Sequence, residues 1–360
     1  MPPRRQYKPK RRFVRRRSTR VPRPHKFIIA NYAPFNEDAL GARIPDANTA
    51  PSFPFHVNDL RTAGLTANPK ANAYLFMPWI KPYSVAATEN VGTWTWAASY
   101  GGGTDSLKQS AIANQSNGIR ACAHGIRIMS PVPTTSATGF IHICLIPFNL
   151  SGATWNSAGA PSNISQMQDC PGYQRYTLAQ ATQSPIYVTN NWVDTTAFEY
   201  QDPDNTYAQN TSRAGGNTTG WMMICLVLEN TCVTGYESNQ LEIENIIHFE
   251  ALPYASQSTL QPTMSAEPSK PNIMAGAANM AQYKPISSTS HESSPTLLAA
   301  INKAFYKGLI AAGLAGVRGV GYGFGSYAAA SAGNYMRRGF RWAGGTIAQF
   351  YPRNNRPLRL

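Results

Sequence analysis

Short apolar runs and alternating apolar and polar positions recur between residues 71 and 252, separated by segments rich in Gly, Asn, Ser and Thr. Runs of this length, with β-branched and aromatic residues, are typical of strands. The pattern predicts about eight strands, over residues 71–85, 117–132, 138–148, 173–178, 186–189, 192–200, 220–229 and 241–252. Pro78 and Pro82 indicate that the first is an edge or bent strand, and Gly125 suggests a bulge in the second.

No helical pattern alternates regularly with these strands, which argues against a parallel α/β sheet. Eight antiparallel strands with long connections suit a double-sheet jelly roll. The predicted fold class is therefore all-β, an eight-stranded antiparallel jelly-roll sandwich over residues 65–260. A disordered basic N-terminal arm and a partly helical basic C-terminal tail are expected on either side of it.

The segments that flank the predicted sandwich have different compositions. Residues 27–64 are punctuated by Pro and Asn and predict an extended linker, with one helical turn after Asn58. Residues 261–294 form a Pro/Ser-rich linker, and 295–360 form an amphipathic and basic Gly/Ala/Arg tail. Apolar residues recur at helical spacing from Pro295 to about residue 312, and Ser294 is a candidate N-cap for that helix.

Charge divides the chain into three parts. The whole chain has 32 Lys and Arg against 18 Asp and Glu, a net charge of +14. Residues 1–26 hold twelve basic and no acidic residues, residues 27–292 have a net charge of −7, and residues 293–360 hold nine basic and no acidic residues. The basic arm, residues 1–26, has too few apolar residues to bury enough surface to fold alone. A segment with this charge can still bind polyphosphate, because binding releases counterions.

The predicted nucleic-acid contacts follow from this distribution. In the arm they are Arg4, Arg5, Lys8, Lys10, Arg11, Arg12, Arg15, Arg16, Arg17, Arg20, Arg23 and Lys26. In the tail they are Arg337, Arg338 and Arg341, which alternate with aromatic residues that suit unstacked bases. The alternatives are a nuclear-localisation signal or solubilising role for the arm, and a tail folded against the body.

Few residues suggest other chemistry. Asp202 and Asp204 have the close spacing of oxygen ligands and are candidates for a structural calcium site at subunit contacts, although the same residues also suit a turn. No other cofactor is expected. The helix from Pro295 suits transient contact with a membrane surface, or packing against its own protein. The five cysteines contain no CxxC pair and predict buried free thiols. Without a nucleophile elbow or HExxH motif, no enzymatic activity is expected.

With the arm, the strands and the basic tail in place, residues 1–260 resemble the coat proteins of small non-enveloped icosahedral viruses. Residues 117–132 and 138–148 resemble the second and third strands of such a shell domain, and residues 220–229 and 241–253 resemble the last two. The likeness is to nodavirus-like shells and to the capsid proteins of bacilladnaviruses, single-stranded DNA viruses of diatoms. Nodavirus coats cleave themselves at an Asn-Ala bond, but this chain has none after residue 250, so autoproteolysis is not carried over.

The resemblance implies a capsid protein that self-assembles into an icosahedral T=3 shell and packages a genome, expected to be single-stranded, through its arm and tail. Such a protein would be made in the host cytoplasm, with nuclear import through the arm an open alternative, and would end in the virion. A different class also fits the residues: a single-stranded nucleic-acid chaperone or transport protein with a β-sandwich core that never forms a closed shell.

Overall fold

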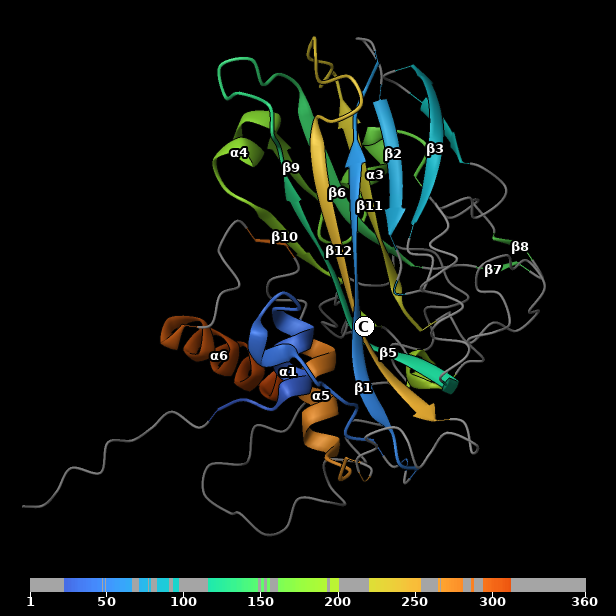
Figure 1. The fold of residues 1–360 in the computed structure, drawn as a ribbon, viewed down its shortest axis with the longest axis vertical. Helices are drawn as coiled ribbons and strands as arrows, with labels where there is room; N and C mark the ends of the chain where they lie inside the picture. Colours follow the sequence, from blue (N-terminus) through green and yellow to red (C-terminus); the bar gives the residue numbers. More distant parts are fainter. Residues whose placement is uncertain are drawn as a thin grey trace, which may run out of the picture.

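The structure is a computed structural model that describes most of the central body of the chain. The described residues are 23–46, 48, 50–66, 71–76, 78, 83–90, 93–96, 116–147, 150–151, 154–155, 161–192, 195–200, 220–253, 265, 267–280, 286–287 and 294–311. They form two packed β-sheets with a group of helices at one end (Figure 1).

The first sheet has the order β1-β12-β5-β10-β13. Its strands are β1 (Phe53–Ala63), β12 (Leu241–Pro253), β5 (Ser116–Met129), β10 (Ile186–Thr189) and β13 (Ile286–Ser287). The second sheet has the order β4-β3-β2-β11-β6-β9. Its strands are β4 (Thr93–Trp96), β3 (Tyr83–Asn90), β2 (Ala71–Phe76), β11 (Met222–Glu229), β6 (Phe140–Pro147) and β9 (Gln174–Thr177). A separate small hairpin joins β7 (Leu150–Ser151) to β8 (Thr154–Trp155).

The topology is that of a jelly roll. Every neighbouring pair of strands is antiparallel. Eight strands make the two four-stranded halves, β1-β12-β5-β10 and β2-β11-β6-β9, so the chain crosses repeatedly between the sheets. The predicted all-β jelly-roll sandwich is therefore confirmed, with β3, β4 and β13 added at the edges.

Apolar side chains fill the sandwich on both sides of the second sheet. Between the sheets lie residues such as Ile126, Ile143 and Leu226. On the other side of the second sheet, Cys144 and Cys225 are buried under Met167 of α3 (Ile164–Gln168). Since both faces are covered, β6 and β11 are near-continuous apolar runs rather than alternating ones. All five cysteines are free; Cys122, Cys144 and Cys225 are buried as predicted, and Cys170 and Cys232 are half-buried.

The predicted linker over residues 27–64 is wrong, as is the helical turn after Asn58. Residues 53–63 form β1, which pairs with β12 along its whole length, from Phe53 opposite Ala251 to Ala63 opposite Leu241. β1 was missed because it is an edge strand with only one half-buried face, and because Pro54 interrupts its pattern. The regions that resemble second and third shell strands are consequently the third and fourth of the eight, while β11 and β12 are the last two, as expected.

Three other expectations change. Residues 71–85 form two paired strands, β2 and β3, instead of one. In place of the strand predicted over 192–200, the described residues 192 and 195–200 form an isolated bridge between Trp192 and Trp221 and a 3-10 helix, η3 (Thr195–Phe198). The ring centres of Trp192 and Phe198 lie 4.8 Å apart. The register shifts in β5 lie at Cys122, between Ala121 and Ala123, and at Asn117, not at Gly125.

Gly125 instead allows another segment of the chain to approach the sheet closely. A Cβ atom there would lie 2.4 Å from Cγ of Pro34 and 2.8 Å from the Val188 carbonyl oxygen. The missing side chain therefore lets the segment after α1 (Lys26–Tyr32) lie directly on the sheet. His248 of β12 reaches the same segment through Nε2, 2.7 Å from the Pro34 carbonyl oxygen. Because side chains alternate along a strand, His248 points away from Ile243 and Ile247, so this segment covers the outer face of the first sheet.

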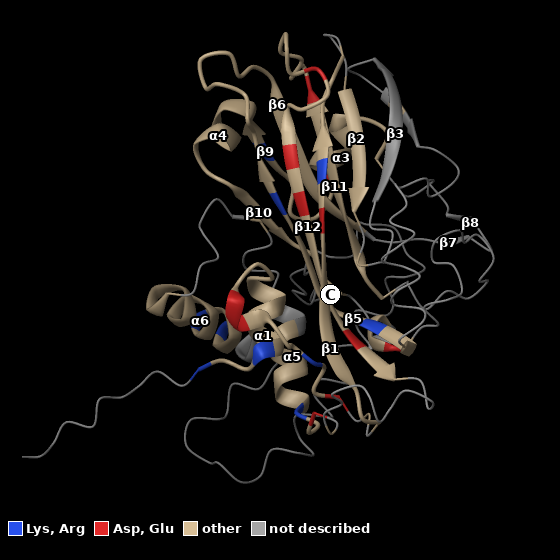
Figure 2. Cartoon of the chain, viewed as in Figure 1, with Lys and Arg blue, Asp and Glu red and all other residues tan. Residues whose placement is uncertain are grey.

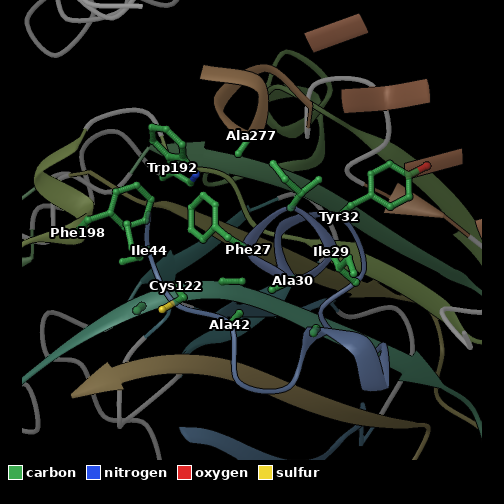
Figure 3. Close-up of a cluster of buried hydrophobic side chains, with 14 of the residues drawn as sticks. Phe27, Ile29, Ala30, Tyr32, Ala42, Ile44, Cys122, Trp192, Phe198 and Ala277 are labelled. Atoms are coloured by element: carbon green, nitrogen blue, oxygen red, sulfur yellow. The ribbon is translucent and has the colours of Figure 1, made fainter. Parts of the chain in front are cut away.

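We call α1, α5 (Pro271–Met280) and α6 (Pro295–Ala311) the helical layer. α1 contacts β5 on one side and both later helices on the other. Figure 3 shows Phe27 and Ile29 of α1 above β5, with Ala277 of α5 beyond them. The predicted helix from Pro295 is confirmed, and Ser294 Oγ caps it by accepting a hydrogen bond from Leu297 N at 3.0 Å. α5 and β13 occupy part of the predicted Pro/Ser-rich linker.

The remaining short helices lie in connections. η1 (Glu37–Ala39) follows α1, and α4 (Leu178–Gln183) follows β9. Within the described residues, no helix is long and apolar enough to cross a membrane.

Candidate nucleic-acid interface

The two basic segments attach to the same part of the molecule. α1 begins at Lys26, directly after the arm, and α6 ends at Ala311, where the tail begins. These helices contact each other although more than 250 residues of sequence separate them. Figure 2 shows basic residues, all of them lysines, on both α1 and α6 within this one layer. The root of the arm and the start of the tail therefore lie on helices of one layer.

The root of the arm is held against the body by specific contacts. The Arg23 guanidinium, 69% exposed, pairs with Asp38 of η1. Lys26 Nζ donates to the Leu40 carbonyl oxygen at 2.7 Å. His25 is the N-cap of α1: its Nδ1 accepts from Phe27 N at 3.3 Å. Arg23 and Lys26, predicted as arm residues, thus belong to the structured edge of the helical layer.

His25 also connects the arm to the C-terminal half of the chain. Its Nε2 lies 2.9 Å from Glu267 Oε1, and because Nδ1 accepts a hydrogen bond, Nε2 carries the proton in the neutral ring. Glu267 further accepts from Lys270 at 3.2 Å and from Arg43 at 3.3 Å. Burial alone would raise the pKa of Glu267, but the hydrogen bonds from His25 and Lys270 outweigh it and hold the pKa below its usual value.

A buried ionic network joins the segment between η1 and β1 to the first sheet. Glu250 of β12 accepts from Arg120 of β5 at 2.8 Å and 3.1 Å, and both side chains are 3% exposed. The same carboxylate accepts from Ile44 N at 3.1 Å and from the Ser52 hydroxyl, in the segment that follows the helices. Asp46 pairs with Arg120 from the solvent side.

The environment keeps Arg120 charged. Burial alone would lower the pKa of Arg120, but the hydrogen bond that it donates to Asp46 and the charge of Glu250 raise it, and the guanidinium lies 4.4 Å from the centre of the Tyr200 ring. With every carboxylate oxygen of Glu250 hydrogen-bonded, the network satisfies the charges that it buries. No local sequence pattern indicates this pairing, because Arg120 and Glu250 are 130 residues apart.

Most of the predicted contact residues lie outside the described part of the chain. These are Arg4, Arg5, Lys8, Lys10, Arg11, Arg12, Arg15, Arg16, Arg17, Arg20, Arg337, Arg338, Arg341 and the candidate calcium ligands Asp202 and Asp204. Among the residues that the structure describes, no group of three or more His, Cys, Asp or Glu side chains could hold a metal ion. The calcium site therefore stays a prediction.

The outer face of α6 adds residues that the sequence pattern only partly revealed. Lys303 and Lys307 were expected opposite the apolar side, and both are exposed. Tyr306 was missed; it is 59% exposed and lies between them on the helix. An aromatic residue in an amphipathic helix normally belongs to the buried side, so periodicity alone did not distinguish it from Phe305.

Comparisons with known proteins reach the fold and no further. No protein-family model matches the chain, and no curated protein matches it in sequence. Solved structures do match. T=1 particles derived from infectious bursal virus share 8% identity with a TM-score of 0.51, covering 79% of this chain and 96% of theirs. The T13 particle of infectious bursal disease virus shares 8% identity with a TM-score of 0.52, covering 80% and 96%. A mutant VP2 protein of the same virus, also in T=1 particles, shares 8% identity with a TM-score of 0.50, covering 83% and 99%.

At this identity the likeness shows a fold shared with viral capsid proteins. It spans nearly the whole of those chains and most of this one. The resemblance to nodavirus-like and bacilladnavirus shells stays a prediction.

Proposed function

We propose that this chain is a viral capsid protein that self-assembles into a non-enveloped icosahedral shell, T=3 in subunit number, and packages a single-stranded genome through its arm and tail. The observation that carries the proposal is the attachment of both basic segments to one helical layer on a capsid-type jelly roll. A shell needs its polyanion on one side of each subunit, and two basic segments rooted in one helical layer suit that requirement. The role is structural, not catalytic.

Charge supports the packaging step. Arm and tail contribute twelve and nine positive charges, whereas residues 27–292 have a net charge of −7. A T=3 shell of about 180 copies would bring roughly 2,000 positive charges from its arms and about 3,800 with its tails. That is the order of charge on a single-stranded genome of a few thousand nucleotides. Calcium at subunit contacts through Asp202 and Asp204, transient membrane contact by the tail, and residence in the virion after synthesis in the host cytoplasm complete the proposal.

The test is to express the full chain and a variant that lacks residues 1–22. Deleting residues 1–26 would also remove the His25 cap and the first residue of α1, so the shorter deletion separates loss of charge from loss of structure. Sedimentation, negative-stain imaging and nuclease treatment then report closure and packaging. We expect closed, uniform particles from the full chain that hold nuclease-protected nucleic acid, and a large loss of protected nucleic acid in the deletion variant.

The chaperone or transport alternative predicts a different outcome. It expects small oligomers that bind nucleic acid and never close, with the full chain as well as with the variant. That result would replace the capsid proposal.

A further inference from the structure

We propose that the outer face of α6 is an ordered contact for single-stranded nucleic acid, in which Tyr306 stacks on a base and Lys303 and Lys307 bind the adjacent phosphates. The inference rests on the proposed function and locates part of the genome contact in the folded body. Tyr306 carries it: its side chain is 59% exposed, and the centre of its ring is held 5.9 Å from the centre of the Phe305 ring. Among the described residues, only Leu40, Leu60 and Tyr306 are large hydrophobic residues with such exposure.

The helix places these three side chains together. Lys303 precedes Tyr306 by three residues and Lys307 follows it directly, while Lys303 and Lys307 are four apart and lie on one side of the helix. Ala299 and Ala300 continue this exposed side with small side chains. No acidic residue occurs after residue 292, so nothing on α6 repels a phosphate. Lysine on phosphate with an aromatic ring under a base is the combination used on single strands.

A membrane surface fits the exposed side of α6 less well than single-stranded nucleic acid does. Its apolar side is already used: Ile301 and Ala304 are buried in the core that includes Phe27 of α1. The α5–α6 contact is also close, because a Cβ atom on Gly276 would lie 2.2 Å from the Phe305 ring. Lipid could reach that side only if the layer opened. The side that remains exposed offers one aromatic ring and two cations, far less apolar area than an interfacial helix buries.

The position of α6 agrees with a nucleic-acid partner. The helix ends at Ala311, directly before the tail with its arginines, and it contacts α1, where Arg23 and Lys26 mark the root of the arm. A strand held by either basic segment is therefore brought to the layer that presents Tyr306. The charges of α6 have the same sign as those of both neighbouring segments, so the layer continues their surface.

The experiment uses the full chain and a short single-stranded oligonucleotide. Zero-length ultraviolet crosslinking followed by peptide mapping should yield an adduct in residues 295–311. Tyr306→Ala should weaken binding about 5- to 150-fold, the range for losing one base–aromatic stack. Tyr306→Phe keeps the ring and should bind as the parent does. In Lys303→Gln with Lys307→Gln, the slope of log affinity against log salt should become shallower by about 1.4, for two lost phosphate contacts.

Controls make each outcome decisive. Leu60→Ala removes another exposed apolar side chain, on the sandwich edge, and should leave oligonucleotide binding unchanged. The inference is overturned if Tyr306→Ala binds the oligonucleotide as the parent does, or if it loses only binding to anionic lipid vesicles. The proposed function fails separately. Crosslinked α6 on subunits that never close would leave this contact standing without a capsid, whereas filled, closed particles unaffected by Tyr306→Ala would leave the capsid without this contact.

Discussion

The sandwich and the helical layer both contain apolar cores, but they assemble them from different parts of the chain. The core between the sheets is built on strands joined by continuous antiparallel pairing, including partners as distant in sequence as β2 and β11. The helical layer joins residues 26–32 to residues 271–280 and 295–311, and it packs against β5 and against Ile247, Phe249 and Ala251 of β12. The first core is specified by many interchangeable apolar positions, and the second depends on a few long-range contacts.

The polar groups differ in the same way. Inside the sandwich, the neutral pair His124 and Asn245 is hydrogen-bonded at 2.7 Å, with Asn190 on the other ring nitrogen at 2.9 Å. At the boundary with the helical layer, full charges are buried instead, on Arg120 and Glu250. A buried neutral network tolerates the loss of one member better than a buried ion pair does. The comparison teaches that the segment between η1 and β1, which follows α1, is attached to the sheet by bonds that single substitutions can break.

The largest effect is expected from Glu250→Gln. This change leaves the Arg120 charge buried with only Asp46 as a carboxylate partner, and breaking a buried pair in this way costs about 3–5 kcal/mol of unfolding free energy. Chemical denaturation of the subunit measures it. Glu244→Gln is the matched control, because Glu244 pairs with Arg127 on the same two strands and the same face but in partial exposure. It should cost about 1 kcal/mol or less. Equal losses of unfolding free energy in both variants would contradict a larger contribution from the buried Arg120–Glu250 pair than from the partly exposed Arg127–Glu244 pair.

Acidification gives the next effect. Burial lowers the pKa of His124 to about 3 and of His248 to about 4, despite the hydrogen bonds to Asn245 and to the Pro34 carbonyl. Between pH 6.5 and about 4 the unfolded chain therefore binds protons that the folded chain rejects. The unfolding free energy should fall as the pH falls through this range, by up to about 1.4 kcal/mol per pH unit for each histidine.

Substituting one histidine at a time separates the contributions of His124 and His248 to this pH dependence. His248→Gln keeps a donor for Pro34 and removes the boundary contribution, so the slope should fall by about half, leaving the share of His124. His56→Gln is the control, since His56 lies opposite His248 on β1 but is exposed. An unchanged slope in His248→Gln would show that the boundary histidine does not titrate as its burial requires.

The smallest effect concerns the interior of the helical layer. In Gly276→Ala the new methyl group would lie 2.2 Å from Cε2 and 2.6 Å from Cδ2 of Phe305, which must move or separate α5 from α6. Such overpacking costs about 1–3 kcal/mol. Hydrogen exchange should show faster exchange in α5 and α6 with the strands unchanged. In an open helix the same substitution stabilises by up to about 1 kcal/mol, so slower exchange would show that the contact is not tight.

The contrast between the regions also explains what the sequence could predict. β5, β6, β11 and β12 were predictable because buried faces impose a strict pattern on their side chains. β1 was not, since an edge strand with Asp59 and Arg61 carries little of that pattern. α6 has both a cap and a clear apolar side. α5 has neither strong periodicity nor strong propensity; Gly276 lowers its propensity but allows the packing against Phe305 that defines it.

The charge of the candidate interface could be predicted from the sequence, but its position in the fold could not. Charge alone indicated a polyanion partner for the arm and tail, because counterion release requires no fixed geometry. That the two segments meet depends on α1 packing against α5 and α6, a contact between distant residues that no local pattern encodes. The Arg120–Glu250 pair and the exposure of the Tyr306 ring could not be predicted for the same reason. Both depend on which residues lie next to them in the fold.

The packing of α1 against α5 and α6 has a consequence for how the protein is made. α1 leaves the ribosome early, whereas its helical partners are among the later segments to emerge. During translation the apolar side chains of Phe27, Ile28 and Ile29 must therefore wait, partly uncovered, while the strands between are synthesised and folded. Only a chain translated through α6 can cover them, so truncated products of interrupted translation keep this surface exposed and are distinguishable from finished subunits.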